Sequence, residues 1–267
     1  MLDIRSISKT FNRGTVNEKK ALSGLSLHLD EGDFVTVIGS NGAGKSTLLN
    51  AIAGTWQVDS GRIVLDGVDI TGLPEYKRAK YIGRVFQDPL MSTAPNMQLE
   101  ENLALALRRG KRRGLRWGVT ERDRERFREE LRALGLGLED RMQEKIGRFS
   151  GGQRQAITML MATLQKPRLL LLDEHTAALD PATAKKVLAI SDRLVQQNHL
   201  TTLMITHNMK DAIAHGNRLI MMDEGRIVLD ICGEEKRHVT KQELLDRFAA
   251  AAGEAVESDQ VLLSDRR

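Results

Sequence analysis

The residues best suited to chemistry lie in one glycine-rich segment near the N-terminus. The segment Gly39-Ser40-Asn41-Gly42-Ala43-Gly44-Lys45-Ser46 matches the pattern G-x-x-x-x-G-K-[ST] in full. Its glycines let the backbone curl so that successive N–H groups point at an anion, and the helix expected after it adds its positive end. Lys45 would reach the β- and γ-phosphates, Ser46 would ligate Mg²⁺, and Thr47 could add a phosphate hydrogen bond. We therefore expect a nucleoside triphosphate site here rather than a turn that binds nothing.

Two carboxylates follow an apolar run later in the chain. Residues 169–172 are four leucines, and Asp173 and Glu174 come directly after them. Such a strand is typical of the centre of a parallel sheet, where ligands gather at the carboxyl ends of the strands. We expect Asp173 to hold Mg²⁺ beside the phosphate loop and Glu174 to polarise the attacking water. The alternative is a strand that simply ends in solvated acids, and the phosphate loop makes that less favourable.

Two weaker candidates also end predicted strands. His207 follows a strand at 200–205, where an imidazole is placed to donate a hydrogen bond to the γ-phosphate and orient the water. A single histidine is more often structural or solvated. Gln87 ends a strand at 81–86, and its amide is placed to reach Mg²⁺ or the water. Spacing alone leaves both assignments open.

The elements that must position these residues alternate in type along most of the chain. Strands are predicted at 2–7, 25–29, 33–38, 62–65, 81–86, 168–172 and 200–205, with a hairpin joining 218–222 to 226–230 through Glu224-Gly225. Helices are predicted from Lys45 onward and at 99–109, 120–134, 151–165, 181–197, 209–215 and 240–252. The stretch from about 89 to 165 is rich in arginine and has no convincing strand. The pattern indicates an α/β core with a helical subdomain inserted into it.

Composition excludes several classes of protein. Of the 267 residues, 41% are hydrophobic and 28% are charged, which is ordinary for a globular chain and excludes disordered or collagen-like classes. No apolar run approaches the roughly 20 residues that a membrane-spanning helix needs. The first ten residues have no apolar core of the kind expected in a secretory signal. The single cysteine, Cys232, excludes a disulfide framework and is expected to be a buried apolar residue. A net charge of +4 is too small to indicate nucleic acid.

A further motif shows what these sites have in common. Ser150-Gly151-Gly152-Gln153 opens a predicted helix, 20 residues before Asp173. A serine N-cap followed by two glycines bares the helix N-terminus, so it offers a second anion-binding surface. Together with the phosphate loop, Leu172-Asp173-Glu174, Leu179-Asp180 and Thr206-His207, this segment resembles the ATP-binding-cassette (ABC) ATPases, over about residues 2–247.

The resemblance implies an α/β P-loop NTPase fold with a mixed sheet and an inserted α-helical subdomain. An ABC ATPase domain is expected at 1–247, with its RecA-like core at about 1–88 and 166–230 and its helical subdomain at about 89–165. Residues 248–267 would then form a C-terminal tail.

The resemblance also implies that two copies of the chain form a dimer. Two cassettes would pair head to tail, so that Ser150, Gly151, Gly152 and Gln153 contact the ATP held by the partner chain. Asp180 would take part in communication between the two halves of that dimer. Phe11 would offer its ring face to the adenine where the family often has tyrosine, and the alternative is a core aromatic residue. Three positions depart from the family pattern, with Phe149 for leucine, His175 for proline and Ala177 for serine.

The function that the resemblance implies is ATP hydrolysis, with ATP and Mg²⁺ as cofactors, coupled to transport of a small solute. The subfamily it suggests serves binding-protein-dependent uptake of tryptophan- or tyrosine-like molecules. Expected partners are a second copy, two membrane permease subunits and a solute-binding protein, at the cytoplasmic face of the cell membrane, without nucleic acid. Exporter ATPases and soluble ABC ATPases are the alternatives. Only 104 residues separate Ser46 from Ser150, which leaves no room for the long coiled coil of the DNA-repair type, and the translation-associated type has two cassettes.

The helical subdomain is expected to couple the cassette to the membrane subunits. The segment 88–97, with Pro89 and Pro95, links Gln87 to the predicted helices. A basic run follows, formed by Arg108, Arg109, Lys111, Arg112, Arg113 and Arg116, with Trp117 beside it. It would contact anionic headgroups or an acidic permease loop. The alternative, favoured for any charge run, is a solvated loop between two helices.

Overall fold

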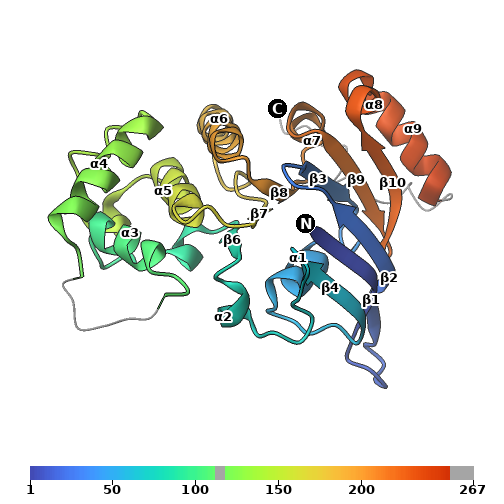
Figure 1. Cartoon of the computed structure of the whole chain (residues 1–267). Coiled ribbons are helices and arrows are strands. Elements are labelled where there is room, and N and C mark those ends of the chain that lie inside the picture. The colour runs from blue at the N-terminus through green and yellow to red at the C-terminus, as the bar shows by residue number, and fades with distance from the viewer. Residues whose placement is uncertain (112–117, 253–267) are drawn as a thin grey trace. The chain divides into compact units, whose positions relative to one another are not determined.

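The computed structural model describes residues 1–111 and 118–252. The described chain divides into two compact units (Figure 1). Unit 1 contains Met1–Arg78 and the residues from Leu200 onward, and unit 2 contains Ala79–His199. None of the described helices is long and apolar enough to cross a bilayer.

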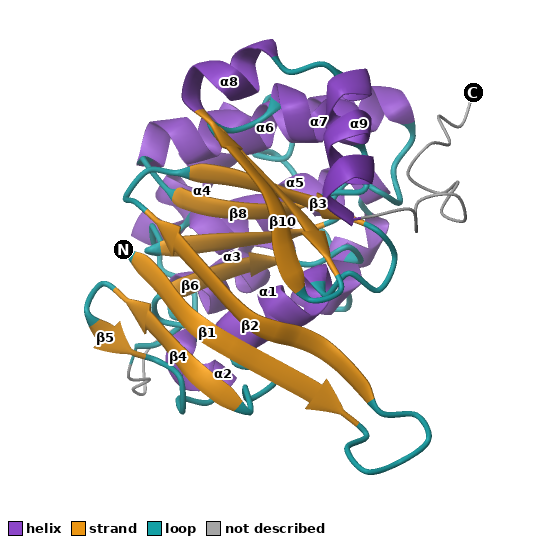
Figure 2. Cartoon of the chain, turned by 90° about the vertical axis from the view of Figure 1, so that its right-hand side faces the viewer, coloured by secondary structure: helices purple, strands orange, loops and turns teal. Residues whose placement is uncertain are grey.

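Unit 1 contains an antiparallel sheet with strand order β2-β1-β4-β5 (Figure 2). Its strands are β1 (Leu2–Phe11), β2 (Lys19–Leu29), β4 (Ser60–Leu65) and β5 (Val68–Asp69). Leu2 pairs with Leu29 on one side and with Leu65 on the other, and all three are buried. The alternation of apolar and polar residues predicted three of these strands. It missed β5, because two residues after a tight turn are too short to show a period.

The remaining strands of unit 1 run in the order β10-β9-β3-β8. They are β3 (Phe34–Gly39), β8 (Thr201–Ile205), β9 (Arg218–Asp223) and β10 (Arg226–Cys232). Both β8 and β9 are parallel to β3, and every residue of β3 is buried. The predicted hairpin is confirmed, because β9 and β10 are antiparallel and the left-handed residues Glu224 and Gly225 join them.

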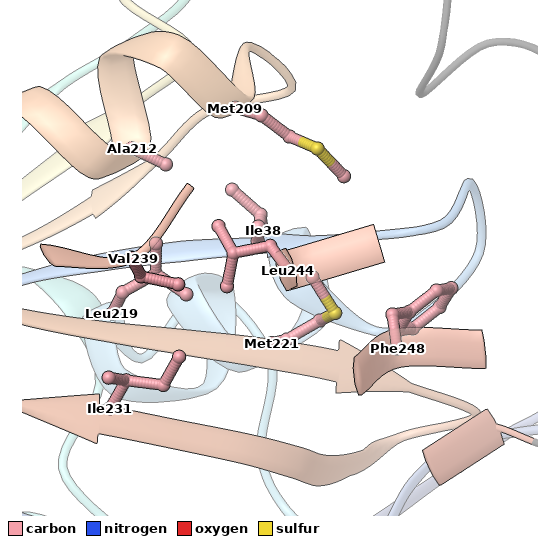
Figure 3. Packing of buried hydrophobic residues seen from close by; sticks show 9 residues of the cluster. All are labelled: Ile38, Met209, Ala212, Leu219, Met221, Ile231, Val239, Leu244 and Phe248. Carbon is pink, nitrogen blue, oxygen red and sulfur yellow. The ribbon is translucent and has the colours of Figure 1, made fainter. Parts of the chain in front are cut away.

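The described helices of unit 1 are α1 (Lys45–Ala53), α2 (Glu75–Arg78), α7 (Met209–Ala214), α8 (Gly233–His238) and α9 (Lys241–Ala252). Leu244 and Phe248 of α9 pack with Met209 and Ala212 of α7 and with Met221 of β9, in a core shared with β3 and β10 (Figure 3). The prediction that Cys232 is buried is wrong, since its side chain is exposed. It is the last residue of β10, an edge strand, where one side has no neighbouring strand.

Unit 2 is built on two parallel strands, β6 (Ile82–Val85) and β7 (Leu169–Asp173), paired from Ile82↔Leu169 to Val85↔Leu172. Its main helices are α3 (Leu99–Leu107), α4 (Glu121–Leu134), α5 (Gly151–Thr163) and α6 (Pro181–Asn198), with 3-10 turns η1 (Pro89–Ser92) and η2 (Ile146–Arg148). As predicted, Thr120 and Ser150 cap α4 and α5, and each side-chain oxygen accepts from a backbone N–H three residues on.

The two compact units differ from the predicted domains in where they divide the chain. Unit 2 includes β6, β7 and α6 together with the helices α3, α4 and α5, whereas the prediction assigns β6, β7 and α6 to the core. Contacts group α6 with α5, on which it packs. The domain limits drawn from the motifs stay a prediction.

A buried arginine in α2 (Glu75–Arg78) holds the end of helix α1. Arg78 is 1% exposed, and its guanidinium donates to the carbonyl oxygens of Ala51 at 2.7 Å and Ile52 at 2.9 Å. It also donates to the carbonyls of Leu73 and Thr71, at 2.7 and 2.8 Å. These bonds satisfy carbonyls that a helix end leaves without an intrahelical donor. Burial lowers the pKa of Arg78 to about 10, so it stays charged near neutral pH.

Replacing Arg78 with methionine should therefore destabilise unit 1. R78M leaves the buried carbonyls without donors, and we expect a loss of about 3 kcal/mol in the free energy of unfolding. Urea unfolding followed by circular dichroism measures it. Lys77→Met, at the exposed neighbouring position, is the matched control and should lose little. Equal losses in the two variants would contradict this role.

Candidate nucleotide site

The phosphate loop follows β3 and enters α1, as its motif requires. Three of its glycines, Gly39, Gly42 and Gly44, have positive φ angles of 151°, 85° and 99°. A Cβ at Gly39 would lie 2.1 Å from the carbonyl oxygen of Met222, and one at Gly44 would lie 2.4 Å from that of Ala21. Only glycine fits these positions, because both the backbone angle and the neighbouring backbone exclude a side chain.

The lysine of the motif lies inside the loop. Lys45 is 7% exposed, and its ammonium donates to the carbonyl oxygens of Gly39 at 2.7 Å and Ser40 at 2.9 Å. Ser40 in turn donates to Asp223 at 3.1 Å. Thr47 is buried in the first turn of α1, whereas Asn41 and Ser46 are exposed. A buried cation within a glycine curl at a helix N-terminus fits the charge and shape of a polyphosphate.

An aromatic pair lies at the end of β1. The rings of Phe11 and Trp56 are 4.8 Å apart between centroids and nearly perpendicular, at 75°. Phe11 is partly exposed. The Asp59 carboxylate accepts from the backbone of Thr10 at 2.7 Å, which lowers the pKa of Asp59 and fixes the strand next to Phe11. Trp56 belongs to no motif, so sequence reasoning had no signal by which to select it.

His207 is the remaining candidate in unit 1. It follows β8 through Thr206 and is exposed, as expected of a residue beyond the carboxyl end of a strand. The Thr206 hydroxyl accepts from the backbone of Asn208 at 3.1 Å, and Asn208 caps α7. These bonds fix the backbone on either side of His207.

The two carboxylates of unit 2 differ in environment. Asp173 ends β7, where burial raises the pKa of its carboxyl and the nearby Arg84 guanidinium opposes that rise. The Arg84–Asp173 ion pair is 3.2 Å long. Glu174 follows with a φ of 44°, an unusual conformation for this residue type that turns the chain sharply after the strand.

Sequence reasoning missed Arg84. Its signal is a single charged residue within β6, three positions before Gln87. Gln87 is exposed beyond β6, and the preceding carbonyl of Phe86 accepts from the buried Gln155 of α5 at 3.2 Å. This bond ties the end of β6 to α5, the helix that begins with the motif at residues 150–153, called here the signature segment.

The kinds of donor atom on these residues show whether they suit a Mg²⁺ ion. Among residues 1–111 and 118–252, no three His, Cys, Asp or Glu side chains gather as a metal site. The predicted Mg²⁺ donors are instead a carboxylate, a hydroxyl and an amide oxygen, on Asp173, Ser46 and Gln87. All are hard oxygen ligands, and Mg²⁺ commonly takes few protein ligands and completes its shell with water and phosphate oxygens. The donor set therefore fits Mg²⁺.

The signature segment forms the N-terminus of α5 and rests on α6. Ser150 accepts from the backbone of Gln153 at 3.3 Å, and Gln153 accepts from that of Ser150 at 3.1 Å. A Cβ at Gly152 would lie 2.1 Å from Cγ2 of Thr183, whereas one at Gly151 would meet only Leu179, at 3.5 Å. Asp180 caps α6 by accepting from the backbone of Thr183 at 3.1 Å. Thr183 thus contacts both motifs.

Two of the departures from the family pattern are accounted for by packing within unit 2. The Phe149 ring is buried beneath the Arg141 guanidinium, 4.5 Å from its centroid, and Arg141 also bonds Glu144. His175 is 2% exposed, and its Nε2 lies 3.0 Å from the Ser191 hydroxyl of α6. Ala177 is exposed.

The predicted residues fall in both units. Phe11, residues 39–47 and His207 belong to unit 1, and Gln87, residues 150–153, Asp173, Glu174 and Asp180 belong to unit 2. Part of the basic run is described, and Arg109 is half-buried and donates to the carbonyl of Ala162 at 3.2 Å, so it is not a solvated charge. Arg112, Arg113, Arg116 and Trp117 lie outside the described residues.

Comparison with known proteins identifies the class. A family model described as ABC transporter matches residues 22–177. The chain is 43% identical over 251 residues to a tyrosine transport ATP-binding protein of Clostridioides difficile, which covers 94% of this chain and all of that protein. It is 35% identical over 230 residues to a spermidine/putrescine import ATP-binding protein of Haemophilus influenzae, which covers 86% of this chain and 57% of that one.

Solved structures agree with the sequence comparison. A dimeric ATP-binding cassette in a post-hydrolysis state with ADP and Pi has a TM-score of 0.74 and 30% identity, covering 87% of this chain and 98% of that one. An ABC-transporter cassette in its ADP conformation has a TM-score of 0.75 and 27% identity, covering 93% and 98%. The fold is therefore that of the ABC ATPases, as predicted.

The chain belongs to the ATP-binding proteins of ABC transporters. It binds ATP and couples ATP hydrolysis to transport, which confirms the predicted activity.

The contact between Gly152 and Thr183 gives a test of the signature helix. G152A should push α5 away from α6, costing about 2 kcal/mol in the free energy of unfolding and most of the ATPase activity. T183S removes the methyl group that the new Cβ would meet, so the double variant G152A/T183S should recover stability. G151A is the control for stability alone, because a Cβ there would meet only Leu179, at 3.5 Å. Urea unfolding and phosphate release measure both effects, and a double variant no better than G152A would contradict the steric explanation.

Proposed function

We propose that this chain, the ATP-hydrolysing subunit that energises uptake in its transporter, binds ATP at residues 39–47 and hydrolyses it with Glu174. The observation that carries the proposal is the phosphate loop, with three glycines in positive φ and a buried lysine turned into its curl. Lys45 contacts the phosphates, the loop N–H groups and Thr47 hold them, and Phe11 stacks on the adenine. The partly exposed ring of Phe11, braced by Trp56, supports that last role.

The residues at the ends of β6, β7 and β8 perform the hydrolysis. Asp173, Ser46 and Gln87 hold Mg²⁺, which supplies positive charge to the phosphates. Glu174 accepts a proton from the attacking water, and His207 and Gln87 orient that water. The backbone of Glu174 supports this assignment. Its φ angle of 44° is unusual for a residue other than glycine, and unusual backbone angles are concentrated at functional sites.

The working form is a head-to-tail pair of two copies. Ser150, Gly151, Gly152 and Gln153 bind the ATP of the partner chain through the N-terminus of α5, and Asp180 passes the state of one site to the other. The dimeric cassette to which this chain is similar supports the pairing. ATP favours the closed pair and hydrolysis releases it, so ATP shifts a population between two states.

The pair is bound to two membrane permease subunits at the cytoplasmic face of the membrane and receives its solute from a solute-binding protein. The solute is an aromatic amino acid or a related small molecule, since a protein 43% identical over 94% of this chain is named for tyrosine transport. In this arrangement residues 1–88 and 166–230 form the nucleotide core, residues 89–165 contact the membrane subunits, and residues 248–267 form a tail.

Two substitutions separate hydrolysis from binding. E174Q should bind ATP normally, lose at least about a hundredfold in turnover and accumulate as an ATP-bound dimer in gel filtration, because the amide cannot accept the proton. K45A should instead weaken ATP binding itself. Emission of Trp56 in a Trp117→Phe background reports binding, since Trp56 contacts Phe11. Parental turnover in E174Q would refute the base assignment.

The solute assignment has its own measurement. We expect vesicles containing the assembled transporter and its solute-binding protein to accumulate radiolabelled tyrosine or tryptophan when ATP is supplied on the cassette side. The E174Q assembly should not accumulate it, because uptake needs turnover. If the parental assembly takes up neither amino acid when ATP is supplied, the assignment of an aromatic solute is wrong. The ATPase assignment is unaffected by that result.

A further inference from the structure

A lysine that belongs to no motif lies beside the phosphate loop. Lys19 is the first residue of β2, and its register partner on the neighbouring strand β1 is Phe11 (Figure 2). A Cβ at Gly42 would lie only 2.9 Å from Nζ of Lys19, so the ammonium lies against the backbone of the loop. A single side chain of unit 1 therefore extends from the strand position beside Phe11 to the phosphate loop.

The charge of Lys19 is not neutralised within the described part of the chain. Its ammonium has no hydrogen bond and no ion pair with any residue described there. The adjacent acid, Glu18, instead accepts from the backbone N–H of Gly14 at 2.7 Å. Asp223, which lies at the loop, accepts from the Ser40 hydroxyl at 3.1 Å. The positive charge of Lys19 is therefore available to an anion that enters the loop.

The position of the ammonium along the loop indicates which phosphates it meets. The backbone N–H groups of such a loop cradle the α- and β-phosphates, and the lysine of the motif reaches the β- and γ-phosphates. The ammonium of Lys45 donates to carbonyl oxygens inside the curl, whereas that of Lys19 lies against Gly42. Lys19 also starts beside Phe11, the residue proposed to stack on the adenine. A cation between the adenine end and the loop backbone meets the phosphates that ATP and ADP share.

The next residue of β2 offers a comparison within the same strand. Lys20 is exposed, as Lys19 is, and it pairs with Thr10 of β1. Successive side chains of a strand point to opposite faces, so Lys20 lies on the face of β2 opposite Lys19. The two lysines therefore have the same charge and similar exposure, and they differ in whether they share a face with the loop contact at Gly42.

We infer that Lys19 binds a phosphate that ATP and ADP share, the α- or the β-phosphate, as a second cation at the loop that contains Lys45. The inference rests on the proposed function, which places ATP at residues 39–47. It adds to that site a residue outside the motifs. It also assigns Lys19 to nucleotide affinity, with no part in activating water, because the phosphate it contacts is not the one that is cleaved.

Calorimetric titration of the purified chain with ADP and with the ATP analogue AMP-PNP tests the inference. Lys19→Met should weaken the binding of both nucleotides by about tenfold, the effect of one lost charge-assisted hydrogen bond. K19R keeps the charge and should lose less. The matched control K20M should bind both as the parental chain does, and circular dichroism checks the folding of each variant. Equal affinities in K19M and K20M would overturn the inference.

Two further comparisons separate a phosphate contact from a structural role. Salt screens a contact between exposed charges, so the difference between K19M and the parental chain should shrink when NaCl is raised from about 50 to about 500 mM. A difference that does not change with salt would contradict a charge contact. A loss for AMP-PNP without a loss for ADP would place the contact at the γ-phosphate and overturn the assignment.

A second measurement uses the parental chain, so it does not depend on a variant that folds. Brief acetylation of exposed lysines, followed by mass spectrometry of the peptides, gives the rates of modification of Lys19 and Lys20. Saturating ADP should slow the modification of Lys19 and leave that of Lys20 unchanged. Adenosine, which lacks phosphate, should slow neither. Equal slowing of Lys19 by adenosine, or none by ADP, would contradict a phosphate contact.

Failure of the proposed function gives a different result. If the parental chain binds neither nucleotide, or K45A binds both as tightly as the parental chain, the proposed site at residues 39–47 is wrong. If K45A loses binding while K19M keeps the parental affinity, only the inference about Lys19 fails.

Discussion

The backbone path of residues 39–45 is the constraint on which the rest of unit 1 depends. The path runs against the carbonyl oxygens of Met222 in β9 and Ala21 in β2, so close that Gly39 and Gly44 have no space for a side chain. Two different sheets therefore determine the shape of one loop. Lys45 completes it, because its ammonium donates to the carbonyl oxygens of Gly39 and Ser40 within the loop.

The same preference for carbonyl partners recurs at other buried cations. Arg78 bonds four carbonyls around the end of α1, and Lys236 bonds those of Gly216 and Arg218 at 3.1 and 3.3 Å. Those two cations are structural, because their donors are used within the fold. Arg109 differs, since one of its buried donors has no partner in the described chain.

Unit 2 connects its motifs through helix contacts. Thr183 contacts the signature at Gly152 and also provides the N–H that Asp180 caps, while Gln155 of the same signature helix bonds the end of β6 before Gln87. A movement of α5 would therefore shift three functional segments together, which are the signature segment, the residues around Asp180 and the end of β6 before Gln87. Close packing explains this coupling, because a close-packed interior transmits strain from one helix to the elements that it contacts.

Motif and periodicity determined much of this protein from the sequence alone. The phosphate loop, the strand ending in Asp173 and the caps at Thr120 and Ser150 depend on residues near one another in the chain, so local spacing is sufficient to find them. The burial of Cys232 was predicted wrongly, because exposure depends on which strand lies at a sheet edge. Only the tertiary structure revealed Arg84 beside Asp173, Trp56 against Phe11, and Arg109 in a pocket with Ser92. Each of these pairs joins distant segments, and a contact of that kind has no period or motif in the sequence.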